Sequence, residues 1–118
     1  MSITLYGIPN CDTVKKSRAW LDDRGIEYAF HDYKKRGADA HEIAVWVEQS
    51  GLDRVLNKAG TTYKKLPDNV KAQMDGPRAI EVMAEQPSLI KRPIVTHNGK
   101  LLVGFKPGEW ETALREAE

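Results

Sequence analysis

The chain contains one cysteine, Cys11, and its position predicts a reactive thiol. It follows a short apolar segment, residues 2–6, and the turn Gly7-Ile8-Pro9-Asn10, where a first β-strand is expected to lead into a helix. Backbone N–H groups in the first turn of a helix lack intrahelical partners and stabilise a nearby anion. The pKa of this thiol is therefore expected to lie below its ordinary value of about 8.5.

A buried, unreactive cysteine is the alternative, because free cysteine often behaves as a small hydrophobic residue. The residues around it are polar and predict a solvent-facing turn, which favours the reactive thiol; they are Asn10, Asp12, Thr13, Lys15 and Lys16. The ammonium group of Lys15, one helical turn further on, is expected to favour the thiolate, and the carboxylate of Asp12 to oppose it. Val14 stands where a C-x-x-C motif would hold a second thiol. A resolving thiol must therefore come from another molecule.

The composition indicates one domain over residues 1–118 and gives no reason to expect nucleic acid or a membrane as partner. The chain has 118 residues, with 18 Lys and Arg against 17 Asp and Glu, for a formal net charge of +1. No Cys/His cluster has the spacing of a zinc site, so no metal is expected. The sequence shows no signal peptide and no apolar run of membrane length, which predicts a soluble, cytoplasmic protein.

The first third of the chain predicts a βαβ unit. A strand over 2–6 is followed by a helix from about Cys11 to Arg24, in which Val14, Arg18 and Leu21 recur at helical spacing. Gly25 is expected to end that helix, and residues 26–32 alternate as a second strand. Two strands joined by a helix are expected to run parallel. The basic residues 34–37 are expected to form a surface turn.

The middle of the chain predicts a helical insert over about 38–88. Asp39 is a candidate N-cap for a helix that Gly51 ends, and residues 52–56 suit a short helical turn. A short helix is expected over 68–74, and a longer one from Pro77 to the residues before Pro87.

The last third predicts a β-hairpin and a closing helix. Residues 93–97 and 100–104 suit two strands joined by Asn98-Gly99, a pair typical of a type I′ turn, and residues 107–117 suit a helix. His97 is expected to be an exposed strand-end residue, and Trp20, Trp46 and Trp110 to pack in the core. The order of elements predicts an α/β fold with a thioredoxin-like mixed β-sheet.

Arg92-Pro93 is the second candidate for the site. In a thioredoxin-like fold, a cis-proline opens the third strand and faces the active cysteine, so the fold predicts a cis Arg92–Pro93 bond. Arg92 would then lie near Cys11 and offer a planar guanidinium to a carboxylate or oxyanion. The alternative is a surface arginine before an edge-strand proline.

Three motifs resemble the ArsC/Spx family of thioredoxin-fold proteins, which includes glutaredoxin-coupled arsenate reductases and the Spx transcriptional regulators. They are Gly7-Ile8-Pro9-Asn10-Cys11, Leu89-Ile90-Lys91-Arg92-Pro93-Ile94-Val95 and Val103-Gly104-Phe105-Lys106. Within the family, the chain is most similar to the YffB branch, small proteins proposed to be glutathione-dependent thiol reductases.

The resemblance implies that Cys11 is the catalytic cysteine, Arg92 an oxyanion-binding arginine and Pro93 the cis-proline. It also shows departures from the arsenate reductases. Asn57 and Lys106 stand in place of their two other anion-binding arginines, and Asp12-Thr13-Val14 replaces a Gly-Thr-Ser stretch. Lysine keeps the charge but lacks the bidentate geometry of arginine, so these departures disfavour arsenate binding.

The function expected is therefore a monothiol oxidoreductase that acts through Cys11 mixed disulfides, with glutathione as co-substrate and no bound cofactor. Glutaredoxin is a further candidate partner, and the substrate is expected to be a small thiol, disulfide or oxyanion. The anion- or glutathione-binding candidates are Arg92, Lys106, Lys15, Asn57 and Asn10. The alternatives are a glutathione- or glutaredoxin-coupled arsenate reductase and an RNA polymerase-binding regulator like Spx. The regulators generally carry a C-x-x-C switch, which Val14 rules out here.

Overall fold

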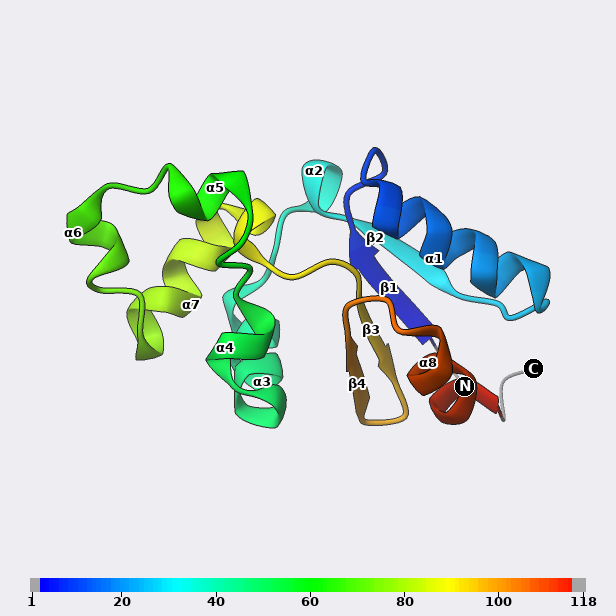
Figure 1. The fold of residues 1–118 in the computed structure, drawn as a ribbon. Helices are drawn as coiled ribbons and strands as arrows, with labels where there is room; N and C mark the ends of the chain where they lie inside the picture. Colours follow the sequence, from blue (N-terminus) through cyan, green and yellow to red (C-terminus); the bar gives the residue numbers. More distant parts are fainter. Residues whose placement is uncertain (1–2, 116–118) are drawn as a thin grey trace. The chain divides into compact units, whose positions relative to one another are not determined.

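The computed structural model describes residues 3–115, which fall into two compact units (Figure 1). Unit 1 comprises the chain up to Arg36 together with the chain from Arg92 onward, and unit 2 comprises Gly37–Lys91. The bounds of unit 2 lie within a few residues of the helical insert expected over 38–88. That the whole chain forms one domain stays a prediction.

Unit 1 is built on a four-stranded mixed sheet with the order β2-β1-β3-β4. Its strands are β1 (Ile3–Gly7), β2 (Ala29–Asp32), β3 (Ile94–His97) and β4 (Lys100–Val103). β1 and β2 run parallel, while β1 with β3 and β3 with β4 run antiparallel. The predicted thioredoxin-like α/β fold is thereby confirmed.

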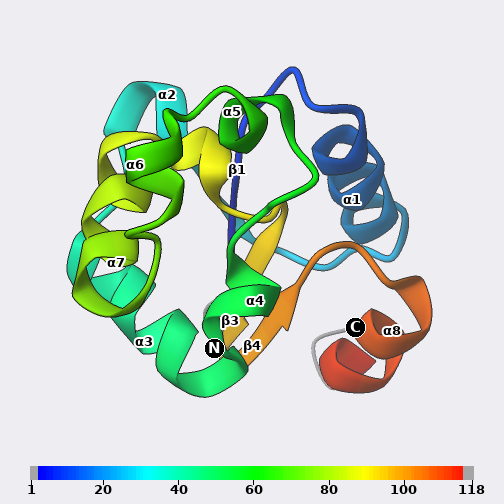
Figure 2. The same ribbon diagram turned by 60° about the vertical axis from the view of Figure 1, so that its left-hand side comes forward.

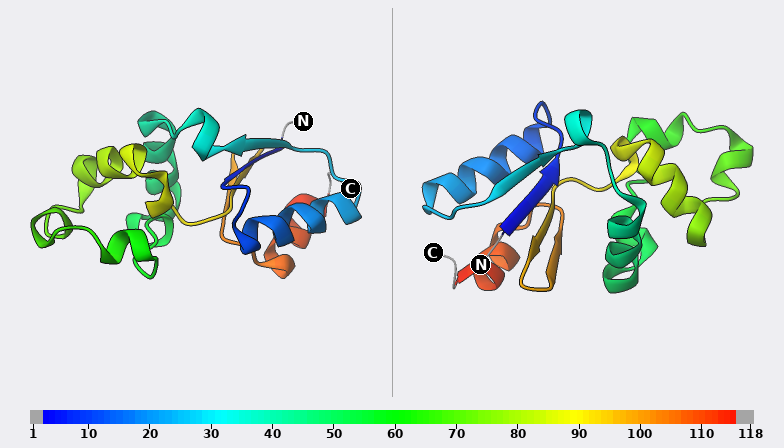
Figure 3. Two further views of the ribbon diagram at one scale, coloured as in Figure 1. Left: turned by 90° about the horizontal axis from the view of Figure 1, so that it is seen from above. Right: turned by 180° about the vertical axis from the view of Figure 1, so that it is seen from behind.

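Two helices cover one face of this sheet, α1 (Asp12–Asp23) and α8 (Pro107–Leu114) (Figure 3). The core between them and the sheet is apolar and includes Ile3, Leu5, Val14, Leu21, Val95, Trp110 and Leu114. Full burial of one such side chain contributes about 1.5–3 kcal/mol, so the packing on this face stabilises unit 1 substantially. The indole Nε1–H of Trp110 also donates to the Gly104 carbonyl oxygen at 3.1 Å, which ties α8 to the end of β4.

Local turn chemistry places the ends of these elements as predicted. Gly25 has a φ of +67°, and its N–H donates to the Asp22 carbonyl while that of Ile26 donates to Leu21, which ends α1. Asn98 and Gly99 have φ values of +50° and +77°, as a type I′ hairpin turn requires.

The tryptophans pack as predicted. Trp46 and Trp110 are buried, and the rings of Trp20 and Trp110 meet edge to face.

His97 corrects the sequence analysis, because it is only 3 % exposed. It pairs with Ile3 across the β1–β3 ladder and lies two residues from Val95, so its side chain is on the core face of the sheet. Exposure was predicted because His97 ends a strand. The face of the sheet on which its side chain lies is instead set by the strand register.

Three further elements of unit 1 differ from the expectations, in extent or in kind. The second strand begins at Ala29 and not at residue 26, because the chain at Gly25 and Ile26 is used to end α1. The expected basic turn is a short helix, α2 (Tyr33–Arg36), where the Asp32 carboxylate accepts the Lys34 N–H at 2.9 Å. The last helix ends at Leu114, and the expectations for residues 2 and 116–117 lie outside the described residues.

Unit 2 is helical (Figure 2). It contains α3 (Ala40–Ser50), α4 (Leu52–Val55), α5 (Thr61–Lys64), α6 (Asp68–Lys71), α7 (Gly76–Glu85) and the 3₁₀ helix η1 (Pro87–Leu89). Asp39 caps α3 by accepting the His41 N–H, and Gly51 ends it with a φ of +89°, as predicted. The helix α5 was not expected, and α6 is shorter than the predicted 68–74. Within residues 3–115, no helix is long and apolar enough to span a membrane.

Candidate active site around Cys11

Cys11 is the N-cap of α1, and its backbone is extended, with φ −87° and ψ 127°. Its N–H donates to the Ile8 carbonyl at 3.2 Å, and its carbonyl accepts the Lys15 N–H at 2.9 Å, so the turn and the helix start are fixed on both sides of the residue. The side chain is half-buried against the core of unit 1. The sulfur is therefore neither sealed in the core nor fully solvated.

The surroundings of the sulfur stabilise the thiolate. Burial raises the pKa of the Cys11 thiol, but hydrogen bonding from the Val14 N–H, from the Arg92 side chain and from the Thr13 N–H lowers it, as does the positive charge of Arg92. The lowering effects prevail, so the pKa lies below its ordinary value. N–H groups in the first turn of a helix stabilise an anion in this way, as the sequence predicted for Cys11.

Arg92 reaches Cys11 because of the antiparallel pairing of β1 and β3. Tyr6, near the end of β1, lies opposite Ile94, which begins β3, so the segment leading to Cys11 and the Arg92-Pro93 segment emerge at the same end of the sheet. The Arg92–Pro93 bond is cis, the isomer expected from the sequence. Pro93 is buried, and its carbonyl accepts the Gly104 N–H at 2.8 Å, which anchors this bend to the end of β4.

Gly7 is a site residue whose role the sequence did not reveal. A Cβ at this position would lie 2.8 Å from Val14 Cγ2, closer than real Cβ contacts allow. The missing side chain lets the first turn of α1 approach the end of β1, and the Val14 N–H in that turn acts on the sulfur. A glycine ending a strand is a weak sequence signal; the contact with Val14 is visible only in the tertiary structure.

The remaining candidates in unit 1 differ in their surroundings. Asn10 and Lys15 are exposed, and the cation that lowers the pKa of Cys11 is Arg92 and not Lys15. Lys106 is exposed at the N-cap of α8, where its ammonium lies 3.6 Å from the Glu109 carboxylate. The binding of an anion or of glutathione by Asn10, Lys15 and Lys106 stays a prediction.

Asn57 belongs to unit 2, and its predicted role likewise stays a prediction. Its N–H donates to the Leu89 carbonyl at 2.7 Å, next to the bridge between Leu56 and Ile90. The side-chain Nδ2 of Asn57 lies 2.8 Å from the position that a Cβ on Gly60 would take. A side chain at position 60 would therefore displace this amide. Over residues 3–115, no three His, Cys, Asp or Glu side chains group as metal ligands would.

Comparison with known proteins gives a consistent family relationship. A family model described as the ArsC family matches residues 6–113. The solved structure of a protein named YffB is 49 % identical, with a TM-score of 0.93, covering 96 % of this chain and 99 % of its own. An arsenate reductase (ArsC) related protein from Brucella melitensis is 50 % identical, with a TM-score of 0.74, covering 98 % of this chain and 96 % of its own.

Curated relatives carry different names. An uncharacterized protein from Haemophilus influenzae is 46 % identical and covers 94 % of this chain and 97 % of its own length. The global transcriptional regulator Spx from Listeria innocua is 28 % identical and covers 91 % of this chain and 82 % of its own length. Proteins named for arsenate reductase and for transcriptional regulation are thus both similar to this chain.

Proposed function

We propose that this chain, which belongs to the ArsC family, is a monothiol–disulfide oxidoreductase that uses Cys11 as nucleophile and glutathione as co-substrate. The observation that supports the proposal is the place of Cys11 at the N-cap of α1, where the N–H groups of Val14 and Thr13 and the Arg92 side chain surround the sulfur and lower the pKa of its thiol. Thiol exchange requires a thiolate, and a thiol of low pKa is also a good leaving group.

The reaction consists of three balanced thiol–disulfide exchanges, of which the first two take place at Cys11. In the first, the Cys11 thiolate attacks one sulfur of a substrate disulfide, an S–S bond forms to Cys11, and the other substrate sulfur leaves as a thiolate. In the second, a glutathione thiolate attacks the substrate-derived sulfur of the mixed disulfide and the Cys11 thiolate leaves. In the third, a further glutathione thiolate attacks the glutathione sulfur of the released mixed disulfide, which yields oxidised glutathione and frees the substrate sulfur as a thiolate. The second thiol comes from outside because the chain has one cysteine.

Arg92 has a defined part in both exchanges at Cys11. Its guanidinium hydrogen-bonds to the sulfur and places a positive charge beside it, so it stabilises Cys11 both before attack and as the leaving group. Lys106 and Lys15 are exposed cations of unit 1 and would attract the carboxylates of glutathione. The ion pair of Lys106 with Glu109 is solvent-exposed and weak, so it does not withhold that cation. Glutaredoxin is a further candidate reductant, and a reducing cytoplasm suits this chemistry.

Mass spectrometry after incubation with oxidised glutathione tests the proposal. The wild-type chain is expected to gain one adduct of glutathione mass on Cys11, which dithiothreitol removes. Cys11→Ser is expected to gain none and to lose turnover in an assay coupled to glutathione reductase. Retention of that turnover by Cys11→Ser contradicts the proposed function.

Arsenate reduction is the second candidate, favoured by the guanidinium of Arg92 on the sulfur and by the name of the Brucella relative. Here Cys11 would form a thiol–arsenate adduct held by Arg92. Expression in an arsenate-sensitive bacterium decides the matter, because restored resistance that depends on Cys11 supports this reaction. A regulatory role like that of Spx is the third candidate, and retention of RNA polymerase subunits on the immobilised chain would support it.

A further inference from the structure

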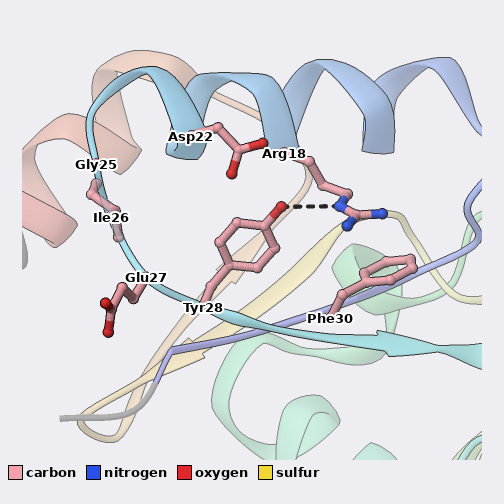
Figure 4. A pocket seen from close by; sticks show the side chains of 7 residues that line it. All are labelled: Arg18, Asp22, Gly25, Ile26, Glu27, Tyr28 and Phe30. Atoms are coloured by element: carbon pink, nitrogen blue, oxygen red, sulfur yellow. Dashed lines mark hydrogen bonds between the residues drawn. The ribbon is translucent and has the colours of Figure 1, made fainter.

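A cavity of about 700 Å³ lies beside α1 in unit 1 (Figure 4). Arg18 and Asp22 of α1 line one side, and the segment Gly25–Phe30, which leads into β2, contributes most of the other. Its volume is ample for a tripeptide, and its lining combines two aromatic rings with charged groups.

Arg18 is held in a fixed position at this cavity. Its Nε–H donates to the Tyr28 hydroxyl at 3.0 Å, and its guanidinium carbon lies 4.2 Å from the centre of the Phe30 ring. A second ring, that of Tyr28, lies 5.9 Å from the same carbon. The stacking and the hydrogen bond leave the guanidinium few alternative positions, so little entropy is lost when it binds a ligand.

The terminal nitrogens of this guanidinium are available to an anion. Asp22 lies one helical turn further along α1, yet none of the ion pairs among residues 3–115 involves Arg18. Figure 4 shows the guanidinium directed away from Asp22, with its Nε toward Tyr28. The planar fork can therefore accept a carboxylate in the bidentate geometry that guanidinium favours.

Arg18 is also aligned with Cys11. It lies seven residues after Cys11, two turns along α1, on the same side of the helix and about 10.5 Å further along its axis. Long helical side chains point back toward the helix N-terminus, and in Figure 4 that of Arg18 extends in this direction. The guanidinium is thus carried from its own turn of the helix toward the turn that holds Cys11.

We propose that Arg18 binds a carboxylate of the peptide thiol whose sulfur reacts at Cys11, and so determines substrate specificity. This inference rests on the proposed function. The ligand class is a small peptide thiol with a carboxylate on the residue next to its cysteine, as in glutathione; the two residues together span about 7 Å when extended. Asp22 and Glu27 line the cavity further from Cys11 and repel a second carboxylate, which sets the direction in which the ligand lies.

Single-turnover formation of the Cys11 mixed disulfide tests the inference. The wild-type chain and Arg18→Gln are each mixed with oxidised glutathione, or with hydroxyethyl disulfide, which has no carboxylate. Arg18→Gln is expected to slow the glutathione adduct about tenfold, the effect of one hydrogen-bonded charge at a half-exposed site, and to leave the hydroxyethyl adduct unchanged. Arg18→Lys keeps the charge, and its rate of glutathione adduct formation is expected to lie between those of the wild-type chain and Arg18→Gln.

The matched control is Arg24→Gln, which removes the same charge at the end of α1 from a guanidinium lying 3.9 Å over Trp20 and outside the cavity. It is expected to leave both rates unchanged, and thermal unfolding verifies that each variant is folded. If Arg18→Gln slows the reactions with oxidised glutathione and with hydroxyethyl disulfide equally, or slows neither of them, the inference is overturned while the proposed function stands. A wild-type chain that forms neither adduct overturns both.

Discussion

Gly7→Ala is expected to destabilise unit 1 and to weaken the reactivity of Cys11 together. The new Cβ would lie 2.8 Å from Val14 Cγ2, and Val14 is fully buried between α1 and the sheet, so its side chain has no free space into which to move. Overpacking of this kind costs about 1–3 kcal/mol. For a chain of this length, we expect the Tm to fall by about 4–12 °C.

The same displacement is expected to move the first turn of α1 away from the sulfur. Because the Val14 N–H lowers the pKa of Cys11, its withdrawal raises that pKa. The rate of alkylation by iodoacetamide, measured as a function of pH, reports the thiolate. Its midpoint is expected at higher pH in Gly7→Ala than in the wild-type chain.

Gly108→Ala is the matched control, since a Cβ there meets no atom within 4 Å and the residue lies in α8. Because Gly108 is in the first turn of α8, the substitution is expected to raise stability by less than the ~0.5–1 kcal/mol typical of a helix interior, and to leave the alkylation midpoint unchanged. A Gly7→Ala chain as stable as Gly108→Ala, with an unchanged midpoint, would refute the argument that Gly7 fixes the helix start.

Three further predictions follow from the same contacts. Arg92→Gln is expected to raise the pKa of Cys11 and to slow glutathione adduct formation at neutral pH about tenfold; Arg92→Lys, with charge but no planar fork, should recover part of the rate. Folding lowers the pKa of Cys11, so the Cys11 thiolate stabilises the folded chain. This contribution to the free energy of unfolding is fully present above the unfolded-state pKa of about 8.5 and is lost as the pH falls through the folded-state pKa. Urea unfolding of the wild type and Cys11→Ser should therefore diverge as the pH rises toward that value, and parallel curves contradict the shift. Trp110→Phe leaves the Gly104 carbonyl without its 3.1 Å hydrogen bond, and calorimetry should record a loss of about 1–3 kcal/mol.

The sequence by itself determined the features that depend on local backbone chemistry. Asn98-Gly99 specified the hairpin because both residues tolerate a positive φ, and Gly25 specified the end of α1 for the same reason. The position of Cys11 at a strand–helix junction was sufficient to predict N–H groups beside its sulfur, and Val14 in place of a second thiol excluded a dithiol mechanism.

Only the tertiary structure decided which distant side chains share an environment. The β1–β3 register turned His97 into the core, whereas its position at a strand end suggested exposure. Packing of α1 against β2 placed the guanidinium of Arg18 over the Phe30 ring, and the close approach of Val14 gave Gly7 its role. The physical reason is that φ and ψ preferences act within a few residues, while register and packing depend on contacts between segments far apart in the chain.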